Sequence, residues 1–116
     1  MSPYKLELEK QPSSNESLAI YKAVGKLSLE TVNEFVTTMR AEAVGYLVLD
    51  LSGVSFLDSA GVGALVSIFV SRRNHAKVFA LAALSQQSLA VVTVAGLQNL
   101  LPVYKTAEEA AAAKKA

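Results

Sequence analysis

Two N-terminal segments alternate apolar and polar residues, the pattern of a strand with one buried face. Residues 4–9, YKLELE, place Leu6 and Leu8 on one face and charged side chains on the other. Residues 18–24, LAIYKAV, predict a second strand, which we expect to end at Gly25. The turn-forming stretch QPSSNES lies between them, so an antiparallel hairpin with a long loop is expected.

From Ser28 the apolar period changes from two residues to that of a helix. Polar side chains take the other faces, so this helix should lie on the sheet with one side in water. Ser28 is the expected N-cap, and Gly45 the expected end. The apolar positions are Leu29, Val32, Phe35, Val36, Met39 and Ala43.

The remaining segments are more continuously apolar. YLVLDLS (46–52) and KVFALAAL (77–84) predict strands buried on both faces, as in parallel sheets. Residues 60–71 are too long an apolar run for a strand and predict a buried helix. Ser85 should cap a helix that ends at Gly96.

The C-terminal segments complete a regular alternation. LLPVY (100–104) predicts a short edge strand, because Pro102 cannot donate a ladder hydrogen bond. Residues 106–115 predict a last helix, with Thr106 and Glu109 at capping-box spacing. The order β-β-α-β-α-β-α-β-α predicts a single α/β domain over residues 1–116, a mixed sheet with four helices packed on it.

Composition and charge narrow the possible functions. Eleven basic and ten acidic side chains give a net charge of +1, which supports neither nucleic-acid binding nor binding to an anionic membrane. The absence of cysteine excludes disulfides, zinc–thiolate sites and thiol catalysis, and one histidine offers little for a metal site. We therefore expect no metal and no cofactor.

The chain also lacks the apolar segments of secreted or membrane proteins. Its start, MSPYKLELEK, has no apolar core of a signal peptide. The longest apolar run, Gly61–Val70, has about ten residues, whereas a spanning helix needs roughly 20. A cytoplasmic protein is expected, as a monomer or weak dimer.

The stretch SFLDSAGVGAL places Asp58 and Ser59 where a buried strand gives way to a buried helix. Either residue could be the helix N-cap, with the glycines allowing close packing. A catalytic serine would need a nearby base, but His75 lies beyond the helix and the stretch is not a G-x-S-x-G elbow. Gly61 and Gly63 alone are weak evidence for a phosphate-binding loop. A phosphorylation switch fits better, because a helix N-terminus exposes its first residues and tolerates a phosphate.

Residues 48–66, VLDLSGVSFLDSAGVGALV, resemble the core signature of STAS domains, specifically of bacterial anti-sigma factor antagonists. That signature has the form hhhDLS-x-V-x-hhDS-x-G, and its last serine is the family's phosphoacceptor, which corresponds to Ser59. VAGLQNLLPVY (94–104) is similar to a later family segment. The family usually carries two acids after the second strand, where this chain has Lys26 and Ser28.

The resemblance implies a binding protein that is not an enzyme. Its unphosphorylated form would bind an anti-sigma factor that is also a serine kinase, and thereby free a sigma factor. The kinase would phosphorylate Ser59 and end binding, and a PPM-type phosphatase would remove the phosphate. The alternative is a STAS subunit of a stress-sensing or transporter-associated complex.

The expected partner-binding surface is the Ser59 end of the sheet. It comprises Asp58, Ser59, Ala60 and Gly61 with the neighbouring turn Leu27–Ser28.

Two further groups of polar residues are expected to have structural roles. Asp50 should bond loop backbone near the end of its strand, and Arg72, Arg73 and His75 should form a solvated helix end.

Overall fold

A computed structural model describes residues 5–114 of the chain. Tyr4 and Lys115, the outermost residues of two expected elements, lie outside this range. The nine expected strands and α-helices are present in the expected order, with one additional 3₁₀ helix, η1. The elements are β1 (Leu6–Lys10), β2 (Leu18–Leu27), α1 (Val32–Ala41), β3 (Tyr46–Leu57), α2 (Ser59–Asn74), β4 (Val78–Ala82), α3 (Gln86–Val94), η1 (Leu97–Asn99), β5 (Val103–Tyr104) and α4 (Ala107–Ala112).

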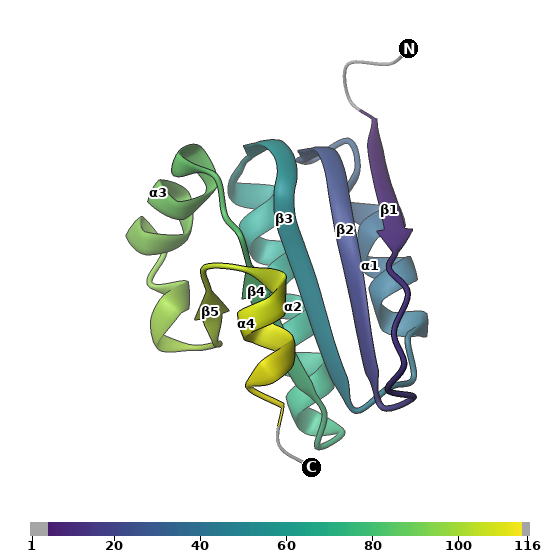
Figure 1. The fold of residues 1–116 in the computed structure, drawn as a ribbon. Coiled ribbons are helices and arrows are strands. Elements are labelled where there is room, and N and C mark those ends of the chain that lie inside the picture. The colour runs from purple at the N-terminus through teal and green to yellow at the C-terminus, as the bar shows by residue number, and fades with distance from the viewer. Residues whose placement is uncertain (1–4, 115–116) are drawn as a thin grey trace.

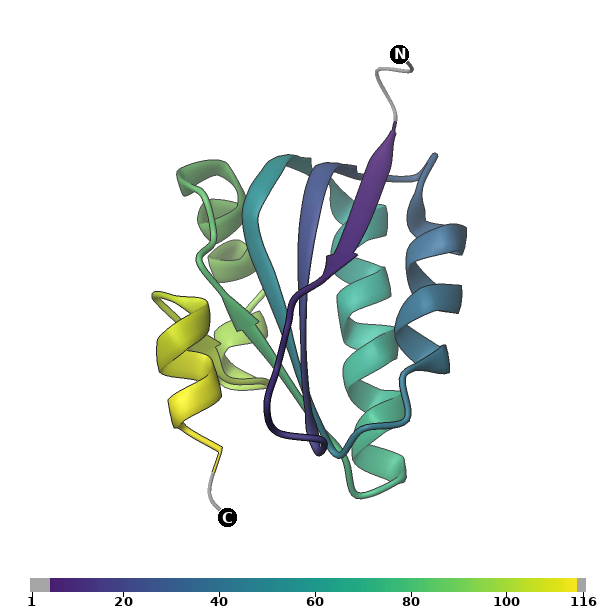
Figure 2. The same cartoon turned by 45° about the vertical axis from the view of Figure 1, so that its right-hand side comes forward.

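The strands form one mixed sheet in the order β1-β2-β3-β4-β5. The β1–β2 pair is antiparallel, as the hairpin prediction required, and the other neighbouring pairs are parallel. Helices α1 and α2 lie on one face and α4 lies on the other (Figures 1 and 2). The predicted fold class, a single α/β domain with a mixed sheet and four helices, is therefore confirmed.

The central strand β3 supplies side chains to both layers. Leu47, Leu49 and Leu51 point into the large core that also contains residues of α1, α2 and α3. Tyr46 and Val48 point to the opposite face and form a small second core with Ala110 of α4. The continuous apolar sequence of β3 thus reflects burial on both faces, as expected for such a strand.

The prediction that β2 ends at Gly25 was wrong. The strand runs through Gly25 to Leu27, with an irregularity in its pairing to β3 at Gly25/Lys26. Gly25 has a φ of 118°, and a Cβ there would lie 2.2 Å from the Lys5 carbonyl oxygen. Glycine is needed because the strand bends against β1 at this point, not because the strand stops.

The predicted cap of α1 was also wrong. Ser28 is buried and lies four residues before Val32, the first residue of the helix. The intervening segment is a turn in which the Ser28 N–H donates to Thr31 Oγ1 at 3.0 Å. This segment directs the Leu29 side chain toward solvent, where it is 69% exposed. Leu29 therefore does not belong to the buried face of the helix, although its position in the apolar pattern had predicted that it would. At its other end α1 stops at Ala41, well before Gly45.

The predicted end of β3 and the predicted bounds of α2 fell short of the observed ones. β3 continues to Leu57, so Asp50 lies within the strand, where its carboxylate accepts the Ser52 N–H at 2.8 Å. α2 extends from Ser59 to Asn74. The caps predicted at Ser85 and Thr106 are confirmed, since each side chain accepts a backbone N–H of its own helix. β5 is an edge strand, as Pro102 indicated.

The Tyr46 hydroxyl anchors α4 by donating to the Ala110 carbonyl at 2.9 Å. Burial, with a smaller contribution from Tyr104, raises the pKa of Tyr46 to about 12, so the hydroxyl keeps its proton at neutral pH. Replacing Tyr46 by Phe leaves a buried carbonyl without its donor, which should cost about 1–3 kcal/mol of unfolding free energy. Urea denaturation measures this loss, and faster amide hydrogen exchange confined to α4 should accompany it. Unchanged exchange in α4 would mean that the hydroxyl does not hold this helix.

Helix α2 packs against the end of β2 through Gly61. A Cβ at this position would lie 2.4 Å from the Leu27 carbonyl oxygen, whereas one at Gly63 would meet no atom within 4 Å. Gly61→Ala should therefore destabilise the fold by about 1–3 kcal/mol or more. Gly63→Ala, the matched control, should be neutral or stabilise by up to about 1 kcal/mol through helix propensity. Urea midpoints of the two variants give the comparison, and equal effects would contradict the packing described.

Candidate functional site

Asp58 and Ser59 divide two tasks at the start of α2. The Asp58 carboxylate is the N-cap, with Oδ1 accepting the Gly61 N–H at 2.9 Å and Oδ2 accepting the Leu29 N–H at 3.2 Å. Ser59 is the first helical residue and is exposed. Its hydroxyl has no hydrogen bond to another residue in the range 5–114, so it is available for modification or contact.

The junction is held from three sides. The Asp58 N–H donates to the Leu27 carbonyl at 3.3 Å, which ties it to the end of β2. Asp58 Oδ2 ties it to the Leu29 turn. On the side of α3, the Gln87 amide accepts the Leu57 N–H at 3.0 Å and donates to the Leu57 carbonyl at 2.9 Å. Because β4 pairs with β3 only as far as Asp50, Gln87 supplies hydrogen bonds that no neighbouring strand provides.

The residues predicted to bind a partner lie together but differ in exposure. Ser59 is exposed, and Asp58 and Ala60 are partly exposed. Leu27, Ser28 and Gly61 are buried directly beneath them. Only the first three present surface that another molecule can touch, and the other three lie in the protein interior. Their predicted part in binding stays a prediction.

A broad apolar groove borders Ser59 and was not predicted from the sequence. It has a volume of about 450 Å³ and lies between the start of α2 and one side of α3. Asp58 is the one charged residue that lines it. Its lining residues are Leu57, Asp58, Ser59, Val62, Ala90, Val91, Val94 and Ala95.

One sequence feature could have revealed the groove. Helix α3, QQSLAVVTV, has no charged residue, although it lies at the surface. Only Ser88 and Val92 are buried in it, and Val94 is 90% exposed. A surface helix without charge leaves apolar side chains in water, and such a patch commonly marks an interaction site. Phe56 and Leu29 add exposed apolar surface at the same end of the sheet.

The site lacks the groups that serine catalysis needs. His75, the one histidine of the sequence, follows the 16-residue helix α2, so it lies roughly 24 Å along the helix axis from Ser59. No group of three or more potential metal-ligating side chains occurs in residues 5–114. Likewise, no helix in the part of the chain that the structure describes could span a membrane. What the site offers is an exposed hydroxyl beside an apolar groove.

The fold is shared with several solved structures. The chain superimposes on an anti-sigma factor antagonist from Mycobacterium paratuberculosis with a TM-score of 0.85 and 21% identity, covering 97% of this chain and 96% of that one. The unphosphorylated form of the anti-sigma factor antagonist SpoIIAA superimposes with a TM-score of 0.70 and 22% identity, covering 92% of this chain and 93% of that one. The STAS domain of a SulP transporter from Vibrio cholerae superimposes with a TM-score of 0.70 and 22% identity, covering 84% of this chain and 80% of that one.

At such identities these structures are evidence for the fold alone, but the sequence itself adds a family match. The profile of the STAS domain matches residues 6–110, which include all the elements from β1 to β5 and most of α4. The signature around Asp58 and Ser59 lies at the β3–α2 junction, where the structure caps the helix and exposes the serine. This chain belongs to the STAS domain family.

Proposed function

We propose that this protein is an anti-sigma factor antagonist whose binding to a partner is switched off by phosphorylation of Ser59. The observation that carries the proposal is the exposed, unbonded Ser59 hydroxyl at the first position of α2, beside an apolar groove. In its unphosphorylated form the protein binds an anti-sigma factor and so releases a sigma factor. The protein acts by binding and is not an enzyme.

Local electrostatics support a phosphate at Ser59 without unfolding. The residue lies in the first turn of α2, where backbone N–H groups and the helix dipole favour negative charge. Asp58 makes the capping bond, so modifying Ser59 leaves the cap in place. The phosphate adds nearly two negative charges beside the Asp58 carboxylate and an apolar groove. Folding therefore tolerates the modification, whereas an apolar or acidic partner surface does not.

The partner that fits this proposal is an anti-sigma factor with serine kinase activity, and a PPM-type phosphatase reverses the reaction. The kinase must bring its own base and nucleotide site, because the Asp58 carboxylate beside Ser59 is bonded to two backbone N–H groups and no cluster of three metal-ligating side chains occurs in the described range. A cytoplasmic location follows from the proposal, since both the sigma factor and ATP are found there. A similar structure is the unphosphorylated form of an anti-sigma factor antagonist, which is consistent with such a cycle.

A second candidate function is a STAS subunit that binds within a transporter-associated or stress-sensing complex. The similarity to the STAS domain of a SulP transporter supports this alternative. The exposed groove between α2 and α3 serves either function, so the two differ in whether Ser59 is a kinase substrate. The experiments below separate them.

Incubation with ATP and the partner kinase should place phosphate on Ser59 alone. Ser28 is buried with its hydroxyl on Glu30, and the Ser55 hydroxyl donates to the Gly25 carbonyl, so both are poorer acceptors. Intact mass and peptide mapping measure the stoichiometry and the position. Phosphate on Ser28 or Ser55 in place of Ser59 would overturn the assignment, and no phosphate at all would favour the second candidate function.

Phosphorylation should weaken partner binding by roughly 30- to 4,000-fold, the equivalent of about 2–5 kcal/mol for an uncompensated charge in an interface. Ser59→Asp should weaken it less, because it carries half the charge and reaches less far. Ser59→Ala should bind like the wild type. Isothermal titration calorimetry with the kinase measures the affinities of the wild type, the phosphoprotein and the two variants.

Two controls accompany this binding series. Urea midpoints establish that the variants are folded. Ser59→Ala should lower the free energy of unfolding by less than the loss of a helix cap does, because Asp58 is the cap. Val94→Ser tests the groove, since Val94 lines it and is far more exposed than a core residue. Tighter binding by Ser59→Asp or by the phosphoprotein would make the phosphate a docking element and refute the off-switch.

A further inference from the structure

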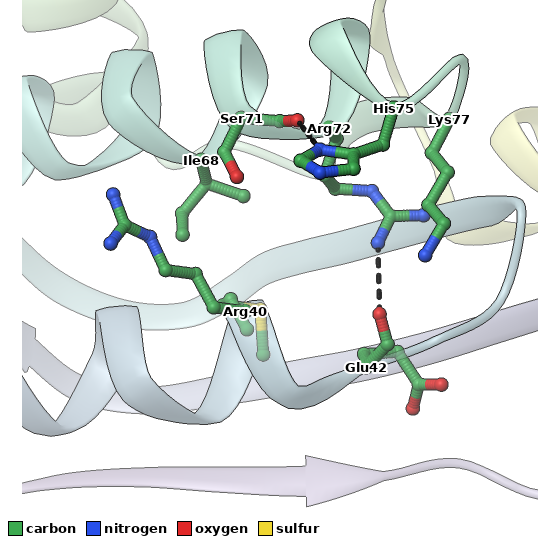
Figure 3. Close-up of a pocket in the computed structure, with 8 residues that line it drawn as sticks. Arg40, Glu42, Ile68, Ser71, Arg72, His75 and Lys77 are labelled. Carbon is green, nitrogen blue, oxygen red and sulfur yellow. Dashed lines mark hydrogen bonds between the residues drawn. The ribbon is translucent and has the colours of Figure 1, made fainter.

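A second pocket lies at the other end of α2, far from Ser59. It is formed where the C-terminal ends of α1 and α2 meet the turn into β4, and its volume is about 140 Å³ (Figure 3). Since roughly 10–15 Å³ of such volume holds one water, a polyatomic ion can enter. Four of its eight lining residues are basic in type. The lining comprises Met39, Arg40, Glu42, Ile68, Ser71, Arg72, His75 and Lys77.

Arg72 forms the buried wall of this pocket, which corrects the prediction of a solvated helix end. The residue is only 5% exposed. Its guanidinium donates to three backbone carbonyls, those of Val78 at 3.0 Å, Glu42 at 3.2 Å and Val44 at 2.5 Å. These bonds use three of the five N–H groups of an arginine, and no carboxylate pairs with it within residues 5–114. A buried positive charge therefore stands at the pocket without a carboxylate of the described residues hydrogen-bonded to it, although the charge of Glu42 acts on it from a distance.

Chain donors occupy several of the carbonyls at the C-terminal ends of the two helices. The Arg72 carbonyl accepts the N–H groups of His75 and Lys77, and the Arg73 carbonyl accepts that of Ala76. The Ala76 φ of 57° closes this turn, an αL cap at the end of the helix. At the end of α1 the Met39 carbonyl accepts the Glu42 N–H. The Met39, Arg72 and Arg73 carbonyls are thus already hydrogen-bonded to donors of the chain.

The acidic residue of the lining is turned away. The Glu42 carboxylate accepts hydrogen bonds from Lys10 at 3.0 Å and Tyr21 at 2.8 Å, on the side of β1 and β2. Figure 3 shows it pointing away from Arg72, which contacts only the Glu42 backbone. Its hydrogen bonds are therefore made outside the pocket, where Lys10 pairs with its charge.

His75 and Lys77 present the remaining polar groups. The His75 ring lies 2.8 Å from the Ser71 carbonyl through Nδ1, which must donate because a carbonyl only accepts. That bond fixes the ring and makes Nε2 of the neutral ring an acceptor, which can bind only a hydroxyl of a protonated oxyanion. The Lys77 ammonium has no hydrogen-bond or ion-pair partner within residues 5–114, and its side chain lies beside Arg72 and His75 in Figure 3.

We propose that Arg72, His75 and Lys77 form a binding site for a small oxyanion of the phosphate or sulfate type, either free or as a phosphate monoester. Two positive charges line the pocket, Arg72 is held rigidly by its three carbonyls, and the hydrogen bonds of the acidic neighbour are made elsewhere. Oxyanions have the several acceptor oxygens that such a set of donors matches. The site is independent of the proposed function, because it lies at the opposite end of α2 from Ser59.

The test is a titration of ¹⁵N-labelled full-length protein with inorganic phosphate, sulfate and glycerol 3-phosphate, monitored by two-dimensional NMR. Sodium chloride at matched ionic strength is the reference. Saturable shifts should appear at the amides of residues 71–77 and be absent near Ser59. Saturation by glycerol 3-phosphate would identify a monoester site, and saturation by phosphate or sulfate alone a free-ion site; either supports the proposal.

Matched variants assign the shifts to the pocket. Lys77→Gln should weaken binding at least fivefold, and His75→Gln should weaken the binding of inorganic phosphate, which carries a hydroxyl, more than that of sulfate. Lys105→Gln, which removes an exposed lysine outside the pocket, should leave the affinity unchanged. Urea midpoints establish that all three are folded, and Arg72 is left intact because its carbonyl bonds hold the turn. Shifts that chloride reproduces, that do not saturate, or that Lys105→Gln reduces as much as Lys77→Gln would overturn the proposal.

Discussion

The contact between Gly61 and the Leu27 carbonyl is the constraint on which the functional end of this protein depends. A helix can approach a strand end so closely only where it has no Cβ, and the approach brings the first turn of α2 over the end of β2. Asp58 then bonds both the helix and the Leu29 turn, two segments far apart in sequence. The exposure of Ser59 is a consequence, because the buried residues Leu57 and Gly61 on either side fix the orientation of this turn.

The same helix carries opposite surfaces at its two ends. Its N-terminal end opens on an apolar groove with one carboxylate, and its C-terminal end opens on a pocket with basic side chains. A cation near a helix C-terminus and an anion near an N-terminus are both electrostatically favoured. The chain can therefore hold two chemically different surfaces on one rigid element without a cost to the fold.

The chemistry at Ser59 is that of an acceptor. The histidine lies at the far end of α2, the hydroxyl is not oriented by a hydrogen bond in the described range, and the adjacent carboxylate is occupied with capping. A reaction at this serine must use groups brought by another protein. The uncharged face of α3 provides the apolar surface on which such a protein can dock next to it.

The sequence by itself determined the order of the elements, the mixed sheet, the caps at Ser85 and Thr106, and the β3–α2 junction at Asp58 and Ser59. These follow from hydrophobic period and short-range hydrogen bonding, which are local in the chain. Only the tertiary structure decided that Ser28 is buried in a turn, that Gly25 bends a strand, that Arg72 is buried, and that α2 and α3 enclose a groove. Each depends on which distant backbone atoms come near, such as Lys5 at Gly25 or the Glu42 and Val44 carbonyls at Arg72. A pattern along one segment contains no information about such neighbours, so packing between segments had to supply it.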